Sequence, residues 1–529
     1  MYNMIQRYTS LGVLAMVGLT QLSLQAQEPA SLIPKPVSMT TVDHTFVWTA
    51  ETQIYVPKGR NRVRKVAALF VDLIAPATGF KPTIKVLKRG NEKGLILKLD
   101  KTLTDLGAEG YRLDIKAESV TLTAGKPAGL FWGLQTLRQM LPARIESNTV
   151  QKGPWRIIGG TITDYPQYGH RGAMLDVARH FFSVADVKQV IDYLAAYKMN
   201  VLHLHLSDDQ GWRIEITSWP RLTDVGSLTQ VGGGKGGFYT QKDYQEIVQY
   251  AKDRYITIVP EIEMPGHINA ALVAYPELNG NTKPATPHTG IEVGFSCVAM
   301  DKEITYKFID DVIGEVAAMT PGQYIHIGGD EVPKKNMQTS FAQFITRVQT
   351  IVQSHDKKMM GWADIAKGDI DKETVTQFWK KEAADAKLAV SKNARILMSP
   401  AYRAYLDMKY SPDCDLGLKW AGYIGVQTAY EWTLSGIVPE IPKEQIVGVE
   451  APLWTETINT MDDIEFMVFP RLLGYAELGW SPDDENTWDE YKVRLGKQKR
   501  RFEGMGINYY KTPQVPWQDV SKSNRPSRQ

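Results

Sequence analysis

Eight short apolar runs recur between residues 172 and 454, and they constrain the fold of this chain more than any other feature. They read GAMLDVA, VLHLHLSDD, TIVPEIEM, YIHIGGDE, KMMGWAD, TVTQFW, RILMSP and IVGVEAPLW. Helical patterns such as SVADVKQVIDYLAAYKM lie between most of them. Eight strands alternating with helices predict a (β/α)8 TIM-type barrel, of fold class α/β. An open doubly wound sheet is the alternative, but the count of eight and the lack of a glycine-rich phosphate turn favour the barrel.

The segment before these runs has a different rhythm. Between about 28 and 160, β-type runs such as QIYVP, GLILKL and SVTLTA interleave with two helix-like stretches. This mixture predicts a smaller α+β domain at 27–160, followed by the barrel at 161–512. Residues 513–529 are polar and contain several prolines, which predicts a frayed tail. The run GGGKGG at 232–237 lacks the ending and the strand-to-helix context of a phosphate loop, so we expect a flexible loop there.

The N-terminus has the pattern of a secretory signal peptide. One arginine and no acid precede the apolar run LGVLAMVGL, and small and polar residues follow it. That run is about half the roughly 20 residues that a membrane anchor needs. We expect cleavage after Ala26, removal of residues 1–26, and export to the periplasm or the medium, with no membrane span afterwards.

Composition adds two expectations. The formal net charge of +2 gives no reason to expect nucleic acid as a partner. The two cysteines, Cys297 and Cys414, could form one disulfide in an oxidising compartment. In so large a core, two buried free thiols are the stronger expectation.

Polar or aromatic residues follow the predicted strands, at the end where barrels of this kind have their sites. A lone carboxylate there is commonly a helix cap, and a lone tryptophan is commonly part of the core. Their recurrence at all eight strand ends predicts a site instead. In chain order they are Asp176 and Arg179, Asp208 and Asp209, Glu263 and His267, Asp330 and Glu331, Trp362 and Asp364, Trp379, Tyr405 and Asp407, and Trp454 and Glu456.

These residue types favour a sugar ligand. Carboxylates and arginine bind pairs of hydroxyl groups, while indole rings cover the apolar C–H face of a pyranose. A metal is the competing interpretation, because His203 and His205 lie on the same side of one predicted strand and could bind zinc. The sequence offers no third ligand at a convincing spacing, so we expect neither a metal nor a cofactor.

Six segments resemble the signature segments of family 20 glycoside hydrolases, the β-N-acetylhexosaminidases. They are LDVARHFF, HLHLSDDQGWR, PEIEMPGH, HIGGDEV, YLDMKY and APLWTE, and they occur in the family's order. The resemblance covers roughly residues 30–500, including a small α+β domain before the barrel. It implies an enzyme that removes terminal β-linked N-acetylhexosamine, GlcNAc or GalNAc, from the non-reducing ends of glycans.

The resemblance also implies catalytic roles. Glu331 matches the general acid/base, and Asp330 matches the residue that orients and polarises the substrate's 2-acetamido group. Tyr405 would hold the acetamido carbonyl oxygen, and Asp208 with His267 would form a supporting network near the acid. In such enzymes the acetamido oxygen itself attacks the anomeric carbon and gives an oxazolinium intermediate, so the protein supplies no nucleophile.

Further residues match sugar-binding positions. Arg179 would bind the 3- and 4-hydroxyls, whereas Arg171, although close in sequence, is interpreted as structural. Glu263 stands where an aspartate is expected, which leaves its role open. The remaining matches are Trp362, Trp379 and Trp454 as pocket walls, Asp407 and Glu456 at the outer hydroxyls, and Trp420 over the next sugar.

The HIGGDE segment yields a geometric expectation. Strand alternation places His326, Gly328 and Asp330 on the barrel interior, and Pro333 predicts that Glu331 is the first loop residue. The two glycines would leave room for the sugar. Burial beside indoles and a like-charged neighbour would keep Glu331 protonated near neutral pH.

Two other functions remain compatible with these residues. One is a secreted glycan-binding protein with an inactive barrel. The other is a different barrel glycosidase that uses two carboxylates on opposite sides of the anomeric carbon.

Overall fold

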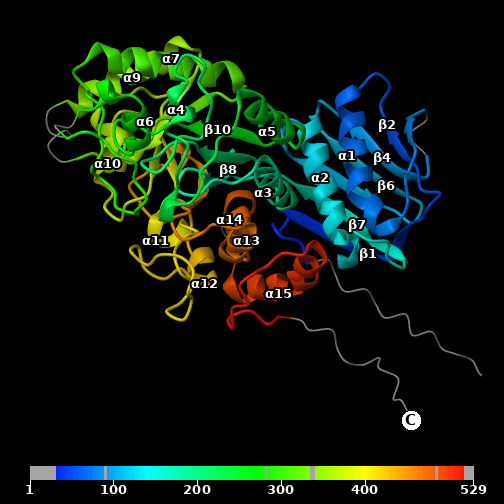
Figure 1. The fold of residues 1–529 in the computed structure, drawn as a ribbon. Helices are drawn as coiled ribbons and strands as arrows, with labels where there is room; N and C mark the ends of the chain where they lie inside the picture. The colour runs from blue at the N-terminus through cyan, green and yellow to red at the C-terminus, as the bar shows by residue number, and fades with distance from the viewer. Residues whose placement is uncertain (1–30, 89–91, 281–282, 334–339, 483–486, 518–529) are drawn as a thin grey trace, which may run out of the picture.

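The computed structural model describes residues 31–88, 92–280, 283–333, 340–482 and 487–517 (Figure 1). The predicted signal peptide at 1–26 lies outside these residues, as does 518–529, the larger part of the predicted tail. In the described part of the chain, no helix combines the length and the hydrophobicity that a membrane crossing requires.

The first unit is a mixed seven-stranded sheet with the order β1-β7-β5-β6-β4-β2-β3. Its strands are β1 (Ser38–Trp48), β2 (Ile54–Val56), β3 (Ile84–Val86), β4 (Gly94–Leu99), β5 (Tyr111–Ile115), β6 (Ser119–Ala124) and β7 (Trp155–Asp164). Helices α1 (Asn61–Thr78) and α2 (Pro127–Met140) lie together against one face of it (Figure 1). This is the predicted α+β domain. The predicted boundary at 160 falls inside β7, which pairs with β1 and β5 up to Asp164.

The second unit is a closed barrel of eight parallel strands, which confirms the predicted TIM-type fold and excludes the open sheet. The strands are β8 (His170–Asp176), β9 (Val201–His205), β10 (Thr257–Glu261), β11 (Tyr324–His326), β12 (Lys358–Trp362), β13 (Val375–Phe378), β14 (Arg395–Met398) and β15 (Ile446–Leu453). Strand β15 pairs with β8 and closes the barrel.

Helices cover the outside of the barrel. The longer ones are α3 (Val184–Ala196), α5 (Gln241–Asp253), α7 (Glu303–Met319), α9 (Phe341–Ser354), α10 (Ala384–Ser391), α13 (Met461–Val468), α14 (Arg471–Trp480) and α15 (Trp488–Met505). The shorter ones are α4 (Arg221–Asp224), α6 (Asn269–Ala274), α11 (Ala401–Ala404) and α12 (Val426–Tyr430), and the 3-10 turns are η1 (Ala143–Glu146), η2 (Val231–Gly233), η3 (Pro276–Leu278), η4 (Ala363–Lys367) and η5 (Lys443–Gln445). Helix α3 begins with a capping box between Ser183 and Asp186.

The barrel interior is layered. Towards the N-terminal ends of the strands, an apolar cluster contains Val201, Val259, Met360, Val375 and Leu397. Two residues further along their strands, the inward positions are polar and fully buried, at His203, Glu261 and Gln377. Side chains fill both layers, so the barrel interior is a packed core, and the C-terminal mouth is where barrels of this kind have their sites.

Arg171 joins the two units. Its guanidinium is fully buried, contacts the Glu109 carboxylate at 2.8 Å and lies over the Trp480 ring. Its Nε and Nη1 atoms donate to the backbone carbonyls of Lys198 and Tyr168. These contacts hold β8 against the first domain, which is a structural role of the kind predicted for this arginine. Cys297 and Cys414 are both buried, and neither forms a disulfide within the described part of the chain.

Candidate active site

A pocket of about 650 Å³ lies at the C-terminal mouth of the barrel. The predicted site residues that line it are Arg179, Asp208, His267, Asp330, Glu331, Trp379, Tyr405, Trp420, Trp454 and Glu456. Trp362 and Asp407 were also predicted but are not among the lining residues. Sequence reasoning missed Ile291, Val293, Leu418 and Lys419, which lie in loops without a motif. His205 and Glu263, noticed in the sequence without a role in the pocket, also line it.

Asp330 and Glu331 lie on a turn, not on a continuing strand. Strand β11 ends at His326, and Gly328 and Gly329 have φ of 66° and 98°. The period-two alternation therefore stops before Asp330, and the expectation that Gly328 and Asp330 share a strand face is wrong. Glu331 is a loop residue, as expected, with φ 46°. The turn, rather than the strand, directs both acids into one pocket.

The two glycines make room for protein side chains, not for the sugar as expected. A Cβ on Gly328 would lie 1.8 Å from Glu263 Oε2, and one on Gly329 would lie 2.5 Å from Ile365 Cγ2. The Gly329 N–H also donates to Glu263 Oε1 at 3.0 Å. Glu263 is thus buried beneath the turn and supports it. Burial, together with the charges of Asp330 and Glu261, raises the pKa of Glu263 well above its usual range, so this carboxyl keeps its proton.

We expected Glu331 to be buried, but Asp330 is the more buried of the two acids. The Glu331 side chain is 36% exposed, with Oε2 at 3.3 Å from His267 Nε2. The Asp330 side chain is 12% exposed, and its Oδ1 has no hydrogen-bond partner. Burial raises the pKa of Asp330 to about 7. His267 lowers this pKa, and the charges of Glu331, Glu261 and Asp364 each raise it further.

His267 and Glu331 both have a left-handed backbone conformation, with φ of 48° and 46°. The other described non-glycine residues with positive φ, namely Lys198, Tyr255, Asp356 and Asn393, each lie just after a helix C-terminus, where this conformation is common. His267 and Glu331 do not follow helices. Strain of this kind costs of order 1–3 kcal/mol per residue and is typical of functional sites.

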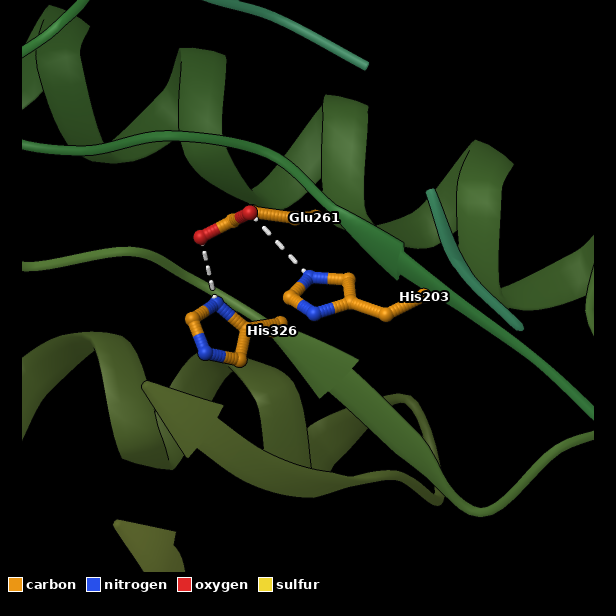
Figure 2. A group of neighbouring side chains, drawn as sticks. All are labelled: His203, Glu261 and His326. Carbon is orange, nitrogen blue, oxygen red and sulfur yellow. Dashed lines mark ion pairs between the residues drawn. The ribbon is translucent and has the colours of Figure 1, made fainter. Parts of the chain in front are cut away.

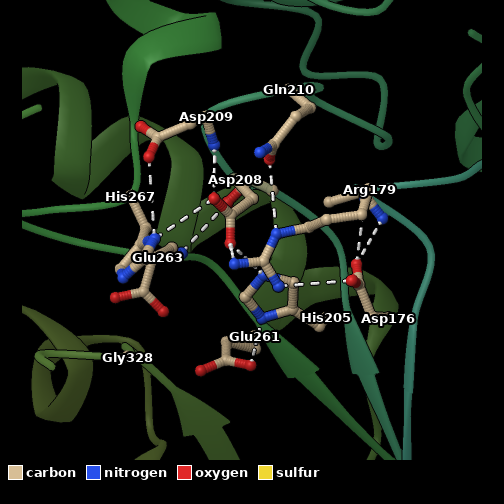
Figure 3. A network of polar contacts seen from close by, with 12 residues as sticks. Asp176, Arg179, His205, Asp208, Asp209, Gln210, Glu261, Glu263, His267 and Gly328 are labelled. Atoms are coloured by element: carbon tan, nitrogen blue, oxygen red, sulfur yellow. Dashed lines mark hydrogen bonds and ion pairs between the residues drawn. The ribbon is translucent and has the colours of Figure 1, made fainter. Parts of the chain in front are cut away.

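A buried network joins the two sides of the pocket (Figure 3). Asp208 contacts Arg179 at 2.8 Å and His205 at 2.9 Å through Oδ2, and His267 at 3.2 Å through Oδ1. Burial alone would raise the pKa of Asp208, but Arg179, His267 and His205 outweigh it and hold the pKa well below its usual range. The pKa of His267 is raised well above its usual range, chiefly by Asp208 acting against burial. Asp208 is therefore an anion between cations.

Aromatic rings enclose the pocket, and of the predicted wall residues Trp362 is the exception. Trp379, Tyr405 and Trp454 are grouped with the exposed Trp420, whose ring meets Tyr405 edge-on at 5.7 Å. Trp362 was expected to wall the pocket, but it is fully buried beneath it, 5.7 Å from the Trp454 ring. Its indole N–H donates to Glu261 Oε1 at 3.1 Å, so the partner from β10 holds it in the floor.

Asp407 is also more deeply placed than expected. It is buried, and among the described residues its carboxylate oxygens make no hydrogen bond of good geometry. Burial and the neighbouring charge of Glu456 raise the pKa of Asp407 well above its usual range. Glu456 lines the pocket and has one unpartnered buried oxygen of its own. A buried carboxyl oxygen without a partner is energetically unfavourable, and a hydrogen bond from a bound ligand would remove this cost. This corner of the pocket therefore suits a polar ligand.

The histidines of β9 belong to an ionic cluster below the pocket (Figure 2). His203, Glu261 and His326 have ligand-type atoms within 4.8 Å of one another, close enough to consider a cation. Burial alone would lower the pKa of His203, but Glu450 and Glu261 raise it to about 9. An imidazolium has no free lone pair for a metal. Burial lowers the pKa of His326, so this argument applies to His203 alone. Glu261 contacts both rings.

Comparison with known proteins decides the family. Residues 168–483 match the model for the glycosyl hydrolase family 20 catalytic domain, and residues 30–165 match that for family 20 domain 2. The chain belongs to glycosyl hydrolase family 20. It is 39% identical to a β-N-acetylhexosaminidase of Cellulomonas fimi, over 92% of this chain and 97% of that protein. The expected enzyme class, a glycoside hydrolase of the β-N-acetylhexosaminidase type acting on N-acetylhexosamine, is thereby confirmed.

Solved structures agree. The family 20 β-N-acetylhexosaminidase of Streptomyces coelicolor has a TM-score of 0.89 and 49% identity, covering 92% of this chain and 99% of that one. A mutant Streptomyces plicatus β-hexosaminidase in complex with its product GlcNAc has a TM-score of 0.89 and 48% identity, covering 92% and 98%. The family 20 enzyme thus has the overall fold of hexosaminidases that have been solved with ligands.

The glycine turn gives a testable prediction. In Gly328→Ala, the new methyl group would overlap the Glu263 carboxyl, so we expect the free energy of unfolding to fall by about 3 kcal/mol or more and kcat to fall with it. Urea denaturation and initial rates measure both effects.

Gly232→Ala is the matched control. Gly232 has φ 77°, but a Cβ there meets nothing within 4 Å, so only the backbone cost of about 1 kcal/mol remains. Equal losses in the two variants would show that the contact with Glu263 does not shape the turn.

Proposed function

We propose that this enzyme removes terminal, non-reducing β-linked N-acetylhexosamine from glycans by a retaining mechanism in which the substrate's acetamido oxygen is the nucleophile. One observation supports the mechanism most strongly. Atoms of Asp330, Glu331 and His267 lie within 4.8 Å of one another, so the two acids share one side of the pocket. A double displacement with an enzyme nucleophile needs the second carboxylate on the opposite face of the anomeric carbon.

Two other acids of the pocket are poor candidates for a nucleophile. Asp208 is held in contacts with Arg179, His205 and His267. Glu263 keeps its proton beneath the glycine turn. Glu331, at the more exposed edge, is placed to serve the departing group, and the buried Asp330 to serve the acetamido group.

In the first step, the acetamido oxygen forms a bond to the anomeric carbon while the glycosidic C–O bond breaks. The proton of Glu331 passes to the leaving oxygen, and Asp330 stabilises the positive charge that develops on the acetamido nitrogen. In the second step, water attacks the anomeric carbon, its proton passes to Glu331, and the oxazolinium ring opens. Two inversions give net retention, and the intramolecular nucleophile brings a large effective molarity.

The surrounding residues fit substrate binding. Burial and nearby acids raise the pKa of Tyr405 well above its usual range, so its hydroxyl keeps the proton needed to donate to the acetamido carbonyl. Trp379 and Trp454 enclose the acetamido methyl and the ring. Arg179 binds ring hydroxyls, with Asp407 and Glu456 as further acceptors at the outer hydroxyls, and Trp420 covers the next sugar.

The direct test compares two chromogenic substrates with the purified protein. Cleavage of an aryl β-N-acetylglucosaminide, with release of free N-acetylglucosamine, is expected. The matching aryl β-glucoside, which lacks the acetamido carbonyl, should be turned over at least about 10³-fold more slowly, because no nucleophile replaces it. Comparable rates on both would contradict the substrate-assisted mechanism, and no cleavage of either would contradict the proposed activity.

The acid role of Glu331 makes a second prediction. Glu331→Gln should lower kcat/KM about 10²- to 10⁴-fold on disaccharides, whose leaving groups need a proton, and much less on aryl glycosides with good leaving groups. Asp330→Asn is the comparison variant and should impair both substrates, because the acetamido charge develops with either. If Glu331→Gln reduced both substrates equally, the acid assignment would be wrong.

We further propose export, on the basis of the N-terminal pattern, which lies outside the described residues. Expression of the full chain in a bacterium with a Sec pathway should yield a mature protein that begins at Gln27. N-terminal sequencing of that protein from the periplasm and the medium measures this. A cytoplasmic protein that retains residues 1–26 would contradict the proposal.

A further inference from the structure

Glu261, the last residue of β10, is the centre of a buried cluster that neither the sequence motifs nor the catalytic roles above explain. It is fully buried, and its carboxylate meets side chains of β9 and β11 (Figures 2 and 3) and the indole of Trp362 on β12. The distances are 2.5 Å to His205 Nδ1, 2.6 Å to His326 Nδ1, 3.1 Å to His203 Nε2 and 3.1 Å to Trp362 Nε1. One carboxylate thus joins β9, β10, β11 and β12 just below the pocket.

Through His205, the cluster reaches the sugar-binding side. His205 bridges Glu261 and Asp208, using one ring nitrogen for each. Asp208 in turn contacts Arg179, which would bind the sugar hydroxyls, and His267, which contacts the catalytic Glu331. The position of Arg179 and that of the acid therefore depend on the same carboxylate.

Two other contacts reach the floor and the catalytic turn. His326 ends β11 and is followed directly by the glycine turn with Asp330 and Glu331. Trp362 packs against Trp379 and Trp454, the walls of the pocket. A shift of Glu261 would thus move the floor and the turn together.

We propose that Glu261 is a positioning residue of this enzyme, whose carboxylate holds the sugar-binding arginine, the catalytic turn and the pocket floor in one fixed arrangement. The effect on catalysis that we expect rests on the proposed function. The negative charge of the Glu261 carboxylate matters as well as its position. Burial alone would raise the pKa of Glu261, but His326, His205 and His203 hold it well below its usual range. Against burial, Glu261 and Asp208 raise the pKa of His205 to about 10, so the pair is ionic.

The charge of Glu261 also acts on Asp330, whose raised pKa of about 7 includes a contribution from it. Asp330 binds a proton below that pKa and loses the anion that stabilises the acetamido nitrogen, so kcat/KM should decline as pH falls through about 7. Removing the Glu261 charge lowers the pKa of Asp330 and should move this acid limb to lower pH. The other ionisable groups that interact with Asp330 are His267, Glu331, Glu263, Asp364, Lys380 and Tyr405. The substitution leaves these side chains in place, but it also removes the contribution of Glu261 to the raised pKa of Glu263.

Glu450 offers a matched control. It is an equally buried carboxylate of the barrel interior. Like Glu261 it contacts His203, and its distance to the His203 ring is 2.8 Å. Its other partners, His170 and Gln377, are not among the residues that line the pocket. Glu450→Gln therefore removes a buried charge and ion pairs of the same kind without touching His205, His326 or Trp362.

The experiment compares Glu261→Gln with Glu450→Gln in the full-length mature protein. For Glu261→Gln we expect kcat to fall at least about tenfold, with a smaller change in KM, and the acid limb of kcat/KM to move down by about half a pH unit. Glu450→Gln should lower the melting temperature similarly while leaving kcat within about threefold and the limb in place. Equal kinetic losses with unmoved limbs would overturn the proposal and leave Glu261 a structural residue.

Two further measurements keep the proposal open to refutation. If Glu261→Gln does not fold, His205→Gln, which cuts the connection between Glu261 and Asp208 and also changes one residue of the pocket lining, should still lower kcat. Normal kinetics in that variant would overturn the proposal. Nitrogen-15 NMR of the imidazoles, assigned with His205→Gln, reports the charge of His205 without any substrate. A wild-type His205 that is neutral at pH 8 would refute the ionic pair. This measurement needs no substrate, so its outcome does not depend on whether the proposed activity is found.

Discussion

Paired charges inside the barrel are the constraint on which the rest of the structure depends. Imidazoles and carboxylates alternate through the interior, from His170 and Glu450 through His203 and Glu261 to His205. Each group is stable only because its neighbours are present, since a buried charge that loses its partner costs about 3–5 kcal/mol. The apolar cluster nearer the N-terminal ends of the strands packs below this ionic layer. The pocket is built directly on top of it.

The adjacency of Asp330 and Glu331 follows from how β11 ends. A strand that continued would turn the two side chains to opposite faces. The left-handed glycines end the strand. Glu263 and Ile365 occupy the space that a side chain at Gly328 or Gly329 would need. The pair of acids then faces a single cavity. This arrangement suits a reaction in which the substrate brings its own nucleophile, because no carboxylate is needed on the far side of the sugar.

The sequence was sufficient for the barrel, because eight apolar runs with helical spacing have few other solutions, and for most of the pocket, because strand ends meet at one mouth. Other features depend on partners from distant strands. The burial of Trp362 follows from the carboxylate of Glu261, and the purpose of Gly328 follows from the side chain of Glu263. Which of the two acids is the more buried depends on the turn, which alternation cannot describe. Ile291 and Val293 enter the pocket from a loop with no periodic pattern at all. The predicted boundary at 160 falls inside β7 for a similar reason, since β7 is defined by its pairing with β1 and β5.

The left-handed conformations of His267 and Glu331 have a consequence for how such an enzyme can change. Their side chains meet at 3.3 Å, so two residues in an unfavourable backbone conformation are in direct contact in the pocket. At both positions glycine or asparagine would relieve the backbone, so selection for stability alone favours losing the imidazole and the acid. The catalytic contact therefore persists only under selection for turnover. A lineage released from that selection would be expected to lose these two side chains early while the barrel around them remained intact.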